Sequence, residues 1–193
     1  MFTLIPWSNC LPYTILLLLL ANSSGSNPLV LHSLSAVDPR AVCTDGSPGA
    51  YYFAPSVATT TAAASTWIIH LEGGGWCYDK KSCAERCPTG SMGPLCSSKL
   101  YSAVRMLDGV FRAEDGTLNA SNKVFVPYCS SDGHMGNNER RPAEGFRFRG
   151  AVIVQAVLRD LVTMHGLAAE GTSHTIVWGG ASAGGRGAMI HLD

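Results

Sequence analysis

The stretch "VWGGASAGGRGAMIHLD", residues 177–193, contains a G-x-S-x-G pattern centred on Ser182. An apolar run at 174–180 precedes the pattern and predicts a strand, and residues 183–192 fit a helix. A nucleophilic serine on an α/β sheet needs such a sharp strand-to-helix turn, with small neighbours that let the helix pack close to the strand. The alternative is a glycine-rich turn without chemistry. The strand–turn–helix context favours a nucleophile.

A second glycine-rich segment, "EGGGWC" at 72–77, follows a predicted buried strand at 67–71. An acyl-transfer enzyme needs backbone N–H donors aimed at the developing oxyanion. In α/β hydrolases one donor follows the nucleophile, which here is Ala183, and the other lies in a loop after an earlier strand. Spacing does not choose among Gly74, Gly75 and Trp76 for that second donor. The alternative is a plain tight turn.

The remaining pattern predicts an α/β fold. Further strands are expected at 49–56 and 123–129, and the apolar stripe at 146–165 predicts a helix that ends before Gly166. Residues 58–65 read as a loop and residues 78–118 as an irregular, cysteine-rich segment. The alternation of strands and helices indicates a mostly parallel, α/β-hydrolase-like sheet with helices on both faces.

The residues that would activate Ser182 are difficult to identify, because in this fold an Asp or Glu and then a His follow the serine in the sequence. His191 would lie about 13 Å along a helix from Ser182, beyond hydrogen-bond reach, and Asp193 farther still. Upstream, His134 and Asp132 remain candidates, since their loop follows a strand and could reach the active edge. The other histidines fit structural roles: His70 in a buried strand, His165 at a helix end and His174 at the opposite edge.

Composition limits the possible partners. Lys plus Arg and Asp plus Glu number 14 each, so the net charge is zero, and nucleic acid and anionic lipid are not expected as partners. The apolar run at 13–21 is shorter than the about 20 residues that span a bilayer, so no stable membrane insertion is expected. It fits a secretory signal peptide over residues 1–25, which predicts a secreted protein; a membrane anchor is the alternative.

Outside that leader the cysteines number six, an even set that in a secreted chain predicts disulfides. Zinc is the alternative, but the spacings lack paired C-x2-C knuckles, and no metal or other cofactor is expected. Asn119 begins an N-glycosylation sequon. The six cysteines are Cys43, Cys77, Cys83, Cys87, Cys96 and Cys129.

Four blocks together are more specific than any one of them: "IIHLEGGGWC", "VFVPYCSSD", "FRFRGAVIVQAVLRDL" and "GGASAGGRGAMIHLD". In this order they resemble the pectin acetylesterase/Notum family of carboxylesterases, from about Cys43 to Asp193. The resemblance implies a secreted serine esterase with Ser182 as nucleophile. Plant-type members remove O-acetyl groups from pectin, and Notum removes a palmitoleoyl group from Wnt proteins. The family's pattern also implies the disulfides Cys43–Cys129 and Cys77–Cys83, with Cys87–Cys96 as the remaining pair.

Family members carry the triad Asp and His well after the serine. We therefore expect residues 43–193 to be the N-terminal part of such a domain, preceded by a lead-in at 26–42, with the C-terminal half missing and little activity in this chain alone. The expected substrate is an acylated polysaccharide, most simply O-acetylated pectin. Two alternatives stay open: a catalytically dead secreted binding module, and a deacylase that removes a lipid from a protein.

Overall fold

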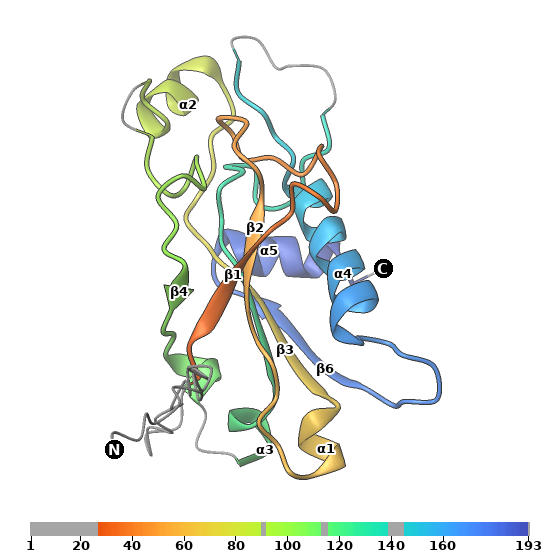
Figure 1. Ribbon diagram of the computed structural model, residues 1–193. Helices are drawn as coiled ribbons and strands as arrows, with labels where there is room; N and C mark the ends of the chain where they lie inside the picture. The colour runs from red at the N-terminus through yellow and green to blue at the C-terminus, as the bar shows by residue number, and fades with distance from the viewer. Residues whose placement is uncertain (1–26, 90–91, 113–115, 139–144, 193) are drawn as a thin grey trace, which may run out of the picture.

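The computed structural model describes residues 27–89, 92–112, 116–138 and 145–192. The expected signal peptide at 1–25 lies outside the described residues. Strands form one sheet in the order β4-β1-β2-β5-β3-β6 (Figure 1). The strands are β1 (Leu29–Ser33), β2 (Ala50–Ala54), β3 (Thr66–Leu71), β4 (Val104–Arg105), β5 (Asn122–Val126) and β6 (Thr175–Gly180).

Two long helices and several short ones accompany the sheet. Figure 1 shows α1 and α3 at one end of the sheet and α2 at the other, with α4 along one side. Within the described chain no helix has the length and apolarity needed to cross a membrane. The helices are α1 (Thr61–Ala64), α2 (Lys80–Arg86), the 3-10 helix η1 (Gly109–Arg112), α3 (Gly116–Asn119), α4 (Gly150–His165) and α5 (Ala183–Ile190).

The sheet is mixed, which corrects the expectation of a mostly parallel one. β3 pairs in parallel with β5 and with β6. β2 pairs antiparallel with β5 and with β1, and β1 pairs antiparallel with β4. The α/β-hydrolase-like character therefore lies in the parallel β5-β3-β6 part, where strand ends meet at one edge and can carry a site.

The two faces of the sheet are covered differently. One face, with Tyr51 and Trp67, packs against the apolar stripe of α4 and against Ala188 of α5. The other face, with Tyr52 and Ile68, packs against Phe111 of η1 and the loop segments around it. Helices on both faces are thus present, but the second face has only short ones. β6 lies at the edge of the described sheet.

The predicted elements that matter for the site lie where the sequence placed them. α4 begins at Gly150 rather than at 146 and ends before Gly166, whose φ of 80° is the left-handed conformation expected there.

Other segments differ from the prediction. The segment at 26–42, expected to be a lead-in, contributes strand β1, which lies between β2 and β4 in the sheet. The expected loop at 58–65 contains the short helix α1, and the irregular segment contains α2, whose N-cap is Asp79.

Candidate active site

The turn between β6 and α5 holds Ser182 in a strained backbone conformation. Ser182 has φ 50° and ψ −115°, a combination that residues with a side chain rarely adopt. The turn is fixed on both sides, since the Ala181 N–H donates to the Leu71 carbonyl at 3.1 Å and the Gly184 N–H donates to the Ala181 carbonyl at 2.7 Å. Ser182 is exposed and directly precedes α5. Its conformation is that of a serine presented at the top of a sheet.

The residues around the turn must be small because the backbone segments pack closely there. A Cβ on Gly184 would lie 2.1 Å from the Leu71 carbonyl oxygen, and one on Gly180 would lie 2.4 Å from the backbone of Gly184. Both distances are impossible for a real side chain, so α5 can approach β3 and β6 only with glycine at these positions. The glycines of the motif therefore set the position of the helix that begins after Ser182.

The loop after β3 lies directly against this turn. A Cβ on Gly73 would be 2.2 Å from the Ala181 carbonyl oxygen and 3.1 Å from the Ser182 Cβ. Gly74 and Gly75 follow with φ values of 151° and 70°, in the left-handed region that favours glycine. The two glycine-rich segments, about a hundred residues apart in the sequence, are thus in contact at one edge of the sheet.

The backbone N–H groups of the four expected oxyanion donors make no hydrogen bond with any described residue. They are therefore free to donate to a bound oxyanion. Ala183 is fully buried at the first position of α5, where the helix dipole adds partial positive charge. Trp76 is 46% exposed. The four are Gly74, Gly75, Trp76 and Ala183.

Arg86 of α2 holds the glycine loop from the outside, a contact that sequence reasoning missed. Its Nη2 donates to the Gly74 carbonyl, and its Nε donates to the Ser131 hydroxyl at 2.9 Å. The disulfides Cys77–Cys83 and Cys87–Cys96 tie the chain on both sides of this arginine. The capping box of Asp79 and Ser82 at the start of α2 was a readable signal for the helix that carries it.

Glu72 connects the end of β3 to its neighbours. Its Oε2 accepts a hydrogen bond from the Tyr128 N–H at 2.9 Å, and its Oε1 lies 3.2 Å from Arg105. The carboxylate thus joins the strand end to the segment after β5 and to β4. Because Glu72 immediately precedes Gly73, these contacts fix where the glycine loop begins.

His134 is placed near the turn but is engaged elsewhere. It is 1% exposed, and its Nε2 lies 2.8 Å from the Glu72 carbonyl oxygen, so Nε2 must carry the proton that is donated. Burial lowers the pKa of His134 to about 4. The ring also lies against the Tyr128 ring at a tilt of 33°, with centroids 4.7 Å apart. Its contacts with Glu72 and Tyr128 are those of a packed structural side chain.

Asp132 organises the same loop. Its carboxylate accepts from the Ser130 hydroxyl at 2.6 Å and from the Gly150 N–H, the first residue of α4, at 2.8 Å. It also accepts from the N–H groups of His134 and Gly136, at 3.0 and 3.2 Å. Burial raises the pKa of Asp132 against the opposing effect of these bonds. The carboxylate is used in fastening the loop to the start of α4.

The other histidines are occupied at a distance from the serine. His191 follows α5 and its Nε2 donates to the His134 carbonyl at 2.8 Å. His70 stacks on Phe125 on the second face of the sheet. His174 accepts from the Trp67 indole N–H at 3.2 Å. Within the described residues, the Ser182 hydroxyl makes no hydrogen bond, so no base is in place there.

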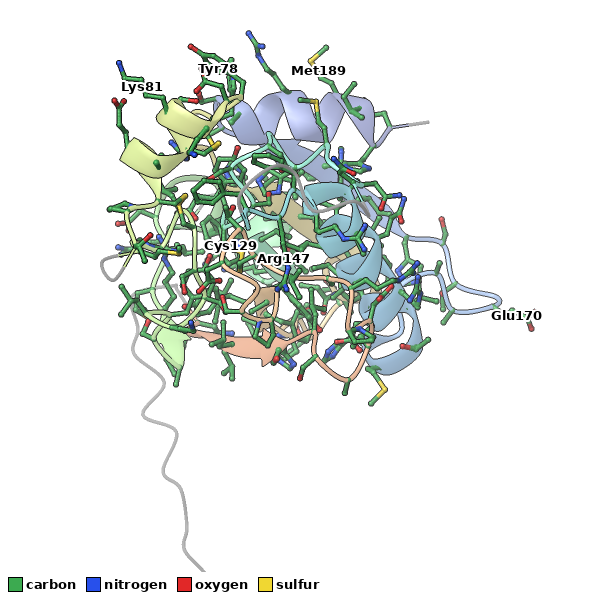
Figure 2. All side chains as sticks on the ribbon, turned by 90° about the horizontal axis from the view of Figure 1, so that it is seen from above. Tyr78, Lys81, Cys129, Arg147, Glu170 and Met189 are labelled. Atoms are coloured by element: carbon green, nitrogen blue, oxygen red, sulfur yellow. A yellow bond between two sulfur atoms is a disulfide. The ribbon has the colours of Figure 1, made fainter. Side chains whose placement is uncertain are left out.

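A cleft of about 470 Å³ adjoins the glycine loop and α5. In it the Arg186 guanidinium lies over the Trp76 ring, 4.7 Å from the centroid. Figure 2 shows Tyr78 and Lys81 on the same side of the molecule as Met189 of α5. The cleft presents a cation and an aromatic surface next to the glycine loop and α5. Its lining residues are Trp76, Cys77, Tyr78, Asp132, Met135, Phe148 and Arg186.

The remaining predicted residues are the six cysteines and Asn119. All six cysteines form disulfides, in the pairs that the resemblance implied, so none of them is left to bind zinc. Cys43–Cys129 is buried and joins residues 86 apart in the sequence. Asn119 is the last residue of α3, and its Oδ1 has no hydrogen-bond partner among the described residues. Its glycosylation stays a prediction.

Comparison with known proteins agrees with this geometry. Residues 23–193 match the family model described as pectinacetylesterase. Pectin acetylesterase 7 from Arabidopsis thaliana is 33% identical over 190 residues, covering 97% of this chain and 45% of that protein. Human palmitoleoyl-protein carboxylesterase NOTUM is 33% identical over 168 residues, covering 86% of this chain and 31% of that protein.

Among solved structures, the Wnt deacylase Notum from Drosophila matches with a TM-score of 0.71 and 29% identity. The match covers 85% of this chain and 44% of that chain. The chain therefore spans less than half the length of these relatives.

Proposed function

Because this chain belongs to the pectin acetylesterase family, we propose that it supplies the nucleophile and the oxyanion loop of a carboxylic ester hydrolase. The observation that carries the proposal is the backbone of Ser182, held at φ 50° in contact with the Gly73 loop. Strain of this kind persists where the surrounding structure enforces it, and it gathers at functional sites.

In the proposed reaction the Ser182 hydroxyl attacks the ester carbonyl and forms a tetrahedral intermediate. The N–H groups of Ala183 and of the Gly74–Trp76 loop hold its oxyanion. A histidine from outside the described residues takes the serine proton and returns it to the leaving alcohol, and an acidic residue orients that histidine. Water then attacks the acyl-serine and releases the carboxylic acid.

For the substrate we propose the O-acetyl groups of pectin or a similar polysaccharide. The cleft next to the glycine loop and α5 supports this choice, because it combines the exposed Trp76 and Tyr78 side chains with the Arg186 guanidinium. Aromatic faces suit sugar rings, and a guanidinium suits the carboxylates of an acidic polysaccharide. The second candidate is a lipid ester on a protein, which the similarity to human NOTUM favours.

We also propose that the protein is secreted and is not inserted in a membrane. Three disulfides support this, because they persist in oxidising compartments. Expression in a secretory host should yield a product in the medium whose N-terminus lies between residues 21 and 26 and whose mass falls on N-glycosidase treatment. Retention in the membrane fraction with an intact N-terminus would indicate an anchor instead.

The activity is tested in two forms of the protein. The 193-residue chain alone should hydrolyse p-nitrophenyl acetate no faster than its Ser182→Ala variant, since its described residues hold no base beside the serine. A clear serine-dependent rate would revive His134 as the base. The chain should then be joined to the part of Arabidopsis pectin acetylesterase 7 that follows the matched region.

The joined protein should release acetate from acetylated pectin and prefer p-nitrophenyl acetate to p-nitrophenyl palmitate. The opposite preference would favour the lipid deacylase. A joined protein that folds, as judged by circular dichroism, but lacks serine-dependent hydrolysis of either ester would favour the catalytically dead binding module. Arg186→Gln should weaken hydrolysis of pectin more than hydrolysis of p-nitrophenyl acetate, which has no carboxylate to bind.

A further inference from the structure

A cluster of metal-ligating side chains lies on the α4 side of the sheet and takes no part in the proposed chemistry. One ring nitrogen each of His32 and His165, and a carboxylate oxygen of Asp160, all lie within 4.8 Å of one another. His32 comes from β1, and the other two come from the last turns of α4. We propose that these three side chains bind a divalent transition-metal ion, Zn²⁺ in the first instance.

The donor set selects the class of ion. Two imidazoles and one carboxylate are ligands that zinc and its neighbours accept, whereas Ca²⁺ and Mg²⁺ prefer oxygen ligands alone. In a tetrahedral site with bonds of about 2.0–2.1 Å the ligand atoms are roughly 3.3 Å apart, so the three atoms need to close by about an ångström or more. The two histidines are only partly buried, which leaves their rings room to turn and leaves solvent a route to a fourth coordination position.

Tyr51 of β2 gives the cluster the outer support that metal ligands require. Its hydroxyl donates to Asp160 Oδ2 at 2.6 Å and lies 3.1 Å from His165 Nε2. The Tyr51 ring stacks on the His32 ring, with centroids 5.1 Å apart. One tyrosine thus contacts all three ligands. Asp160 Oδ1 makes no hydrogen bond with the described residues and is free to bind an ion.

Each ligand is placed by the fold rather than by a local motif. His32 and Tyr51 are direct cross-strand partners in the β1–β2 pair. Asp160 and His165 reach the same point because α4 packs on this face. An ion held by β1 and α4 would fasten the first described strand to the principal helix, so its expected effect is on stability and not on ester hydrolysis.

The test uses the whole chain, freed of metal by chelator, and Zn²⁺ as the probe. Calorimetric titration should give one equivalent of tight binding, and Zn²⁺ should raise the melting temperature. His32→Gln and His165→Gln should each weaken binding at least about tenfold and reduce the rise in melting temperature accordingly. His174→Gln is the matched control, because His174 is also half-buried but lies outside the cluster, and it should bind like the parent.

Cobalt supplies a readout that does not depend on stability. Co²⁺ bound by two imidazoles and a carboxylate should give visible absorption bands that both glutamine variants lose. Circular dichroism of the metal-free variants checks that they remain folded. Absence of stoichiometric zinc binding, equal binding by the parent and both variants, or a preference for Ca²⁺ over Zn²⁺ would each overturn the proposal.

Discussion

The Nε2 of His134 donates to the carbonyl oxygen of Glu72 across a distance of 2.8 Å. This bond joins the loop after β5 to the residue that immediately precedes the glycine loop. The imidazole that makes it is buried, and burial keeps it neutral at acidic pH values at which an exposed histidine would be protonated.

The stability of the protein should therefore fall in acid because of His134. Its pKa is about 4 when folded and near 6.5 in an unfolded chain. Protons thus bind the unfolded state first, and stability present above about pH 6.5 is lost as the pH falls toward 4, by up to roughly 3 kcal/mol. Urea titrations between pH 4 and 8 should show this slope, and His134→Gln should flatten it. An equal slope in parent and variant would show that His134 is not its source.

The Asp132 carboxylate should be the main fastening of that loop. Asp132→Asn keeps the size of the side chain but places an N–H₂ group against backbone N–H donors, so a loss of about 3 kcal/mol is expected. The control is Asp108→Asn, because the Asp108 side chain is 85% exposed and should change stability by no more than about 0.5 kcal/mol. Chemical denaturation measures both. If Asp132→Asn lowers the free energy of unfolding no more than Asp108→Asn does, the Asp132 carboxylate does not fasten the loop.

Features at this edge of the sheet could be predicted from the sequence where neighbouring residues form them, and could not where residues far apart in the chain form them. The strand, turn and helix around Ser182 follow from a short apolar run and a cluster of glycines, and the structure has them in place. Asp132 and His134 looked like candidate acid and base because residue type does not reveal a side chain's partner. Contacts with Gly150 and Glu72, which lie far away in the sequence, decided their roles.

The antiparallel half of the sheet was missed for a related reason. β1 has a weak apolar pattern, with only Leu29 fully buried, and its pairing with β2 and β4 makes it a strand. The spacing of His32, Asp160 and His165 in the sequence matches no pattern that would predict a metal site. Features formed by residues far apart in the chain could be found only from the fold, whereas the turn at Ser182 could be predicted from the sequence.

The contact between Gly73 and Ala181 should tolerate no side chain. Gly73→Ala would place a Cβ 2.2 Å from a backbone oxygen, so either the glycine loop or the serine turn must move, and a loss of about 2 kcal/mol or more is expected. Gly93→Ala is the matched control, since a Cβ there meets nothing within 4 Å. Thermal denaturation compares the two. Equal stability of both variants would mean that the two loops do not touch as described.

The central claim is that Ser182 is the nucleophile, and it is tested most directly in the protein joined to the C-terminal part of the Arabidopsis relative. Ser182→Ala should lower kcat/KM for p-nitrophenyl acetate by roughly a thousandfold or more, while circular dichroism and melting temperature stay unchanged. Mass spectrometry after acid quenching should find an acetyl group on Ser182 of the parent. A Ser182→Ala variant that keeps the parent rate, or an acetyl group on another residue, would contradict the claim.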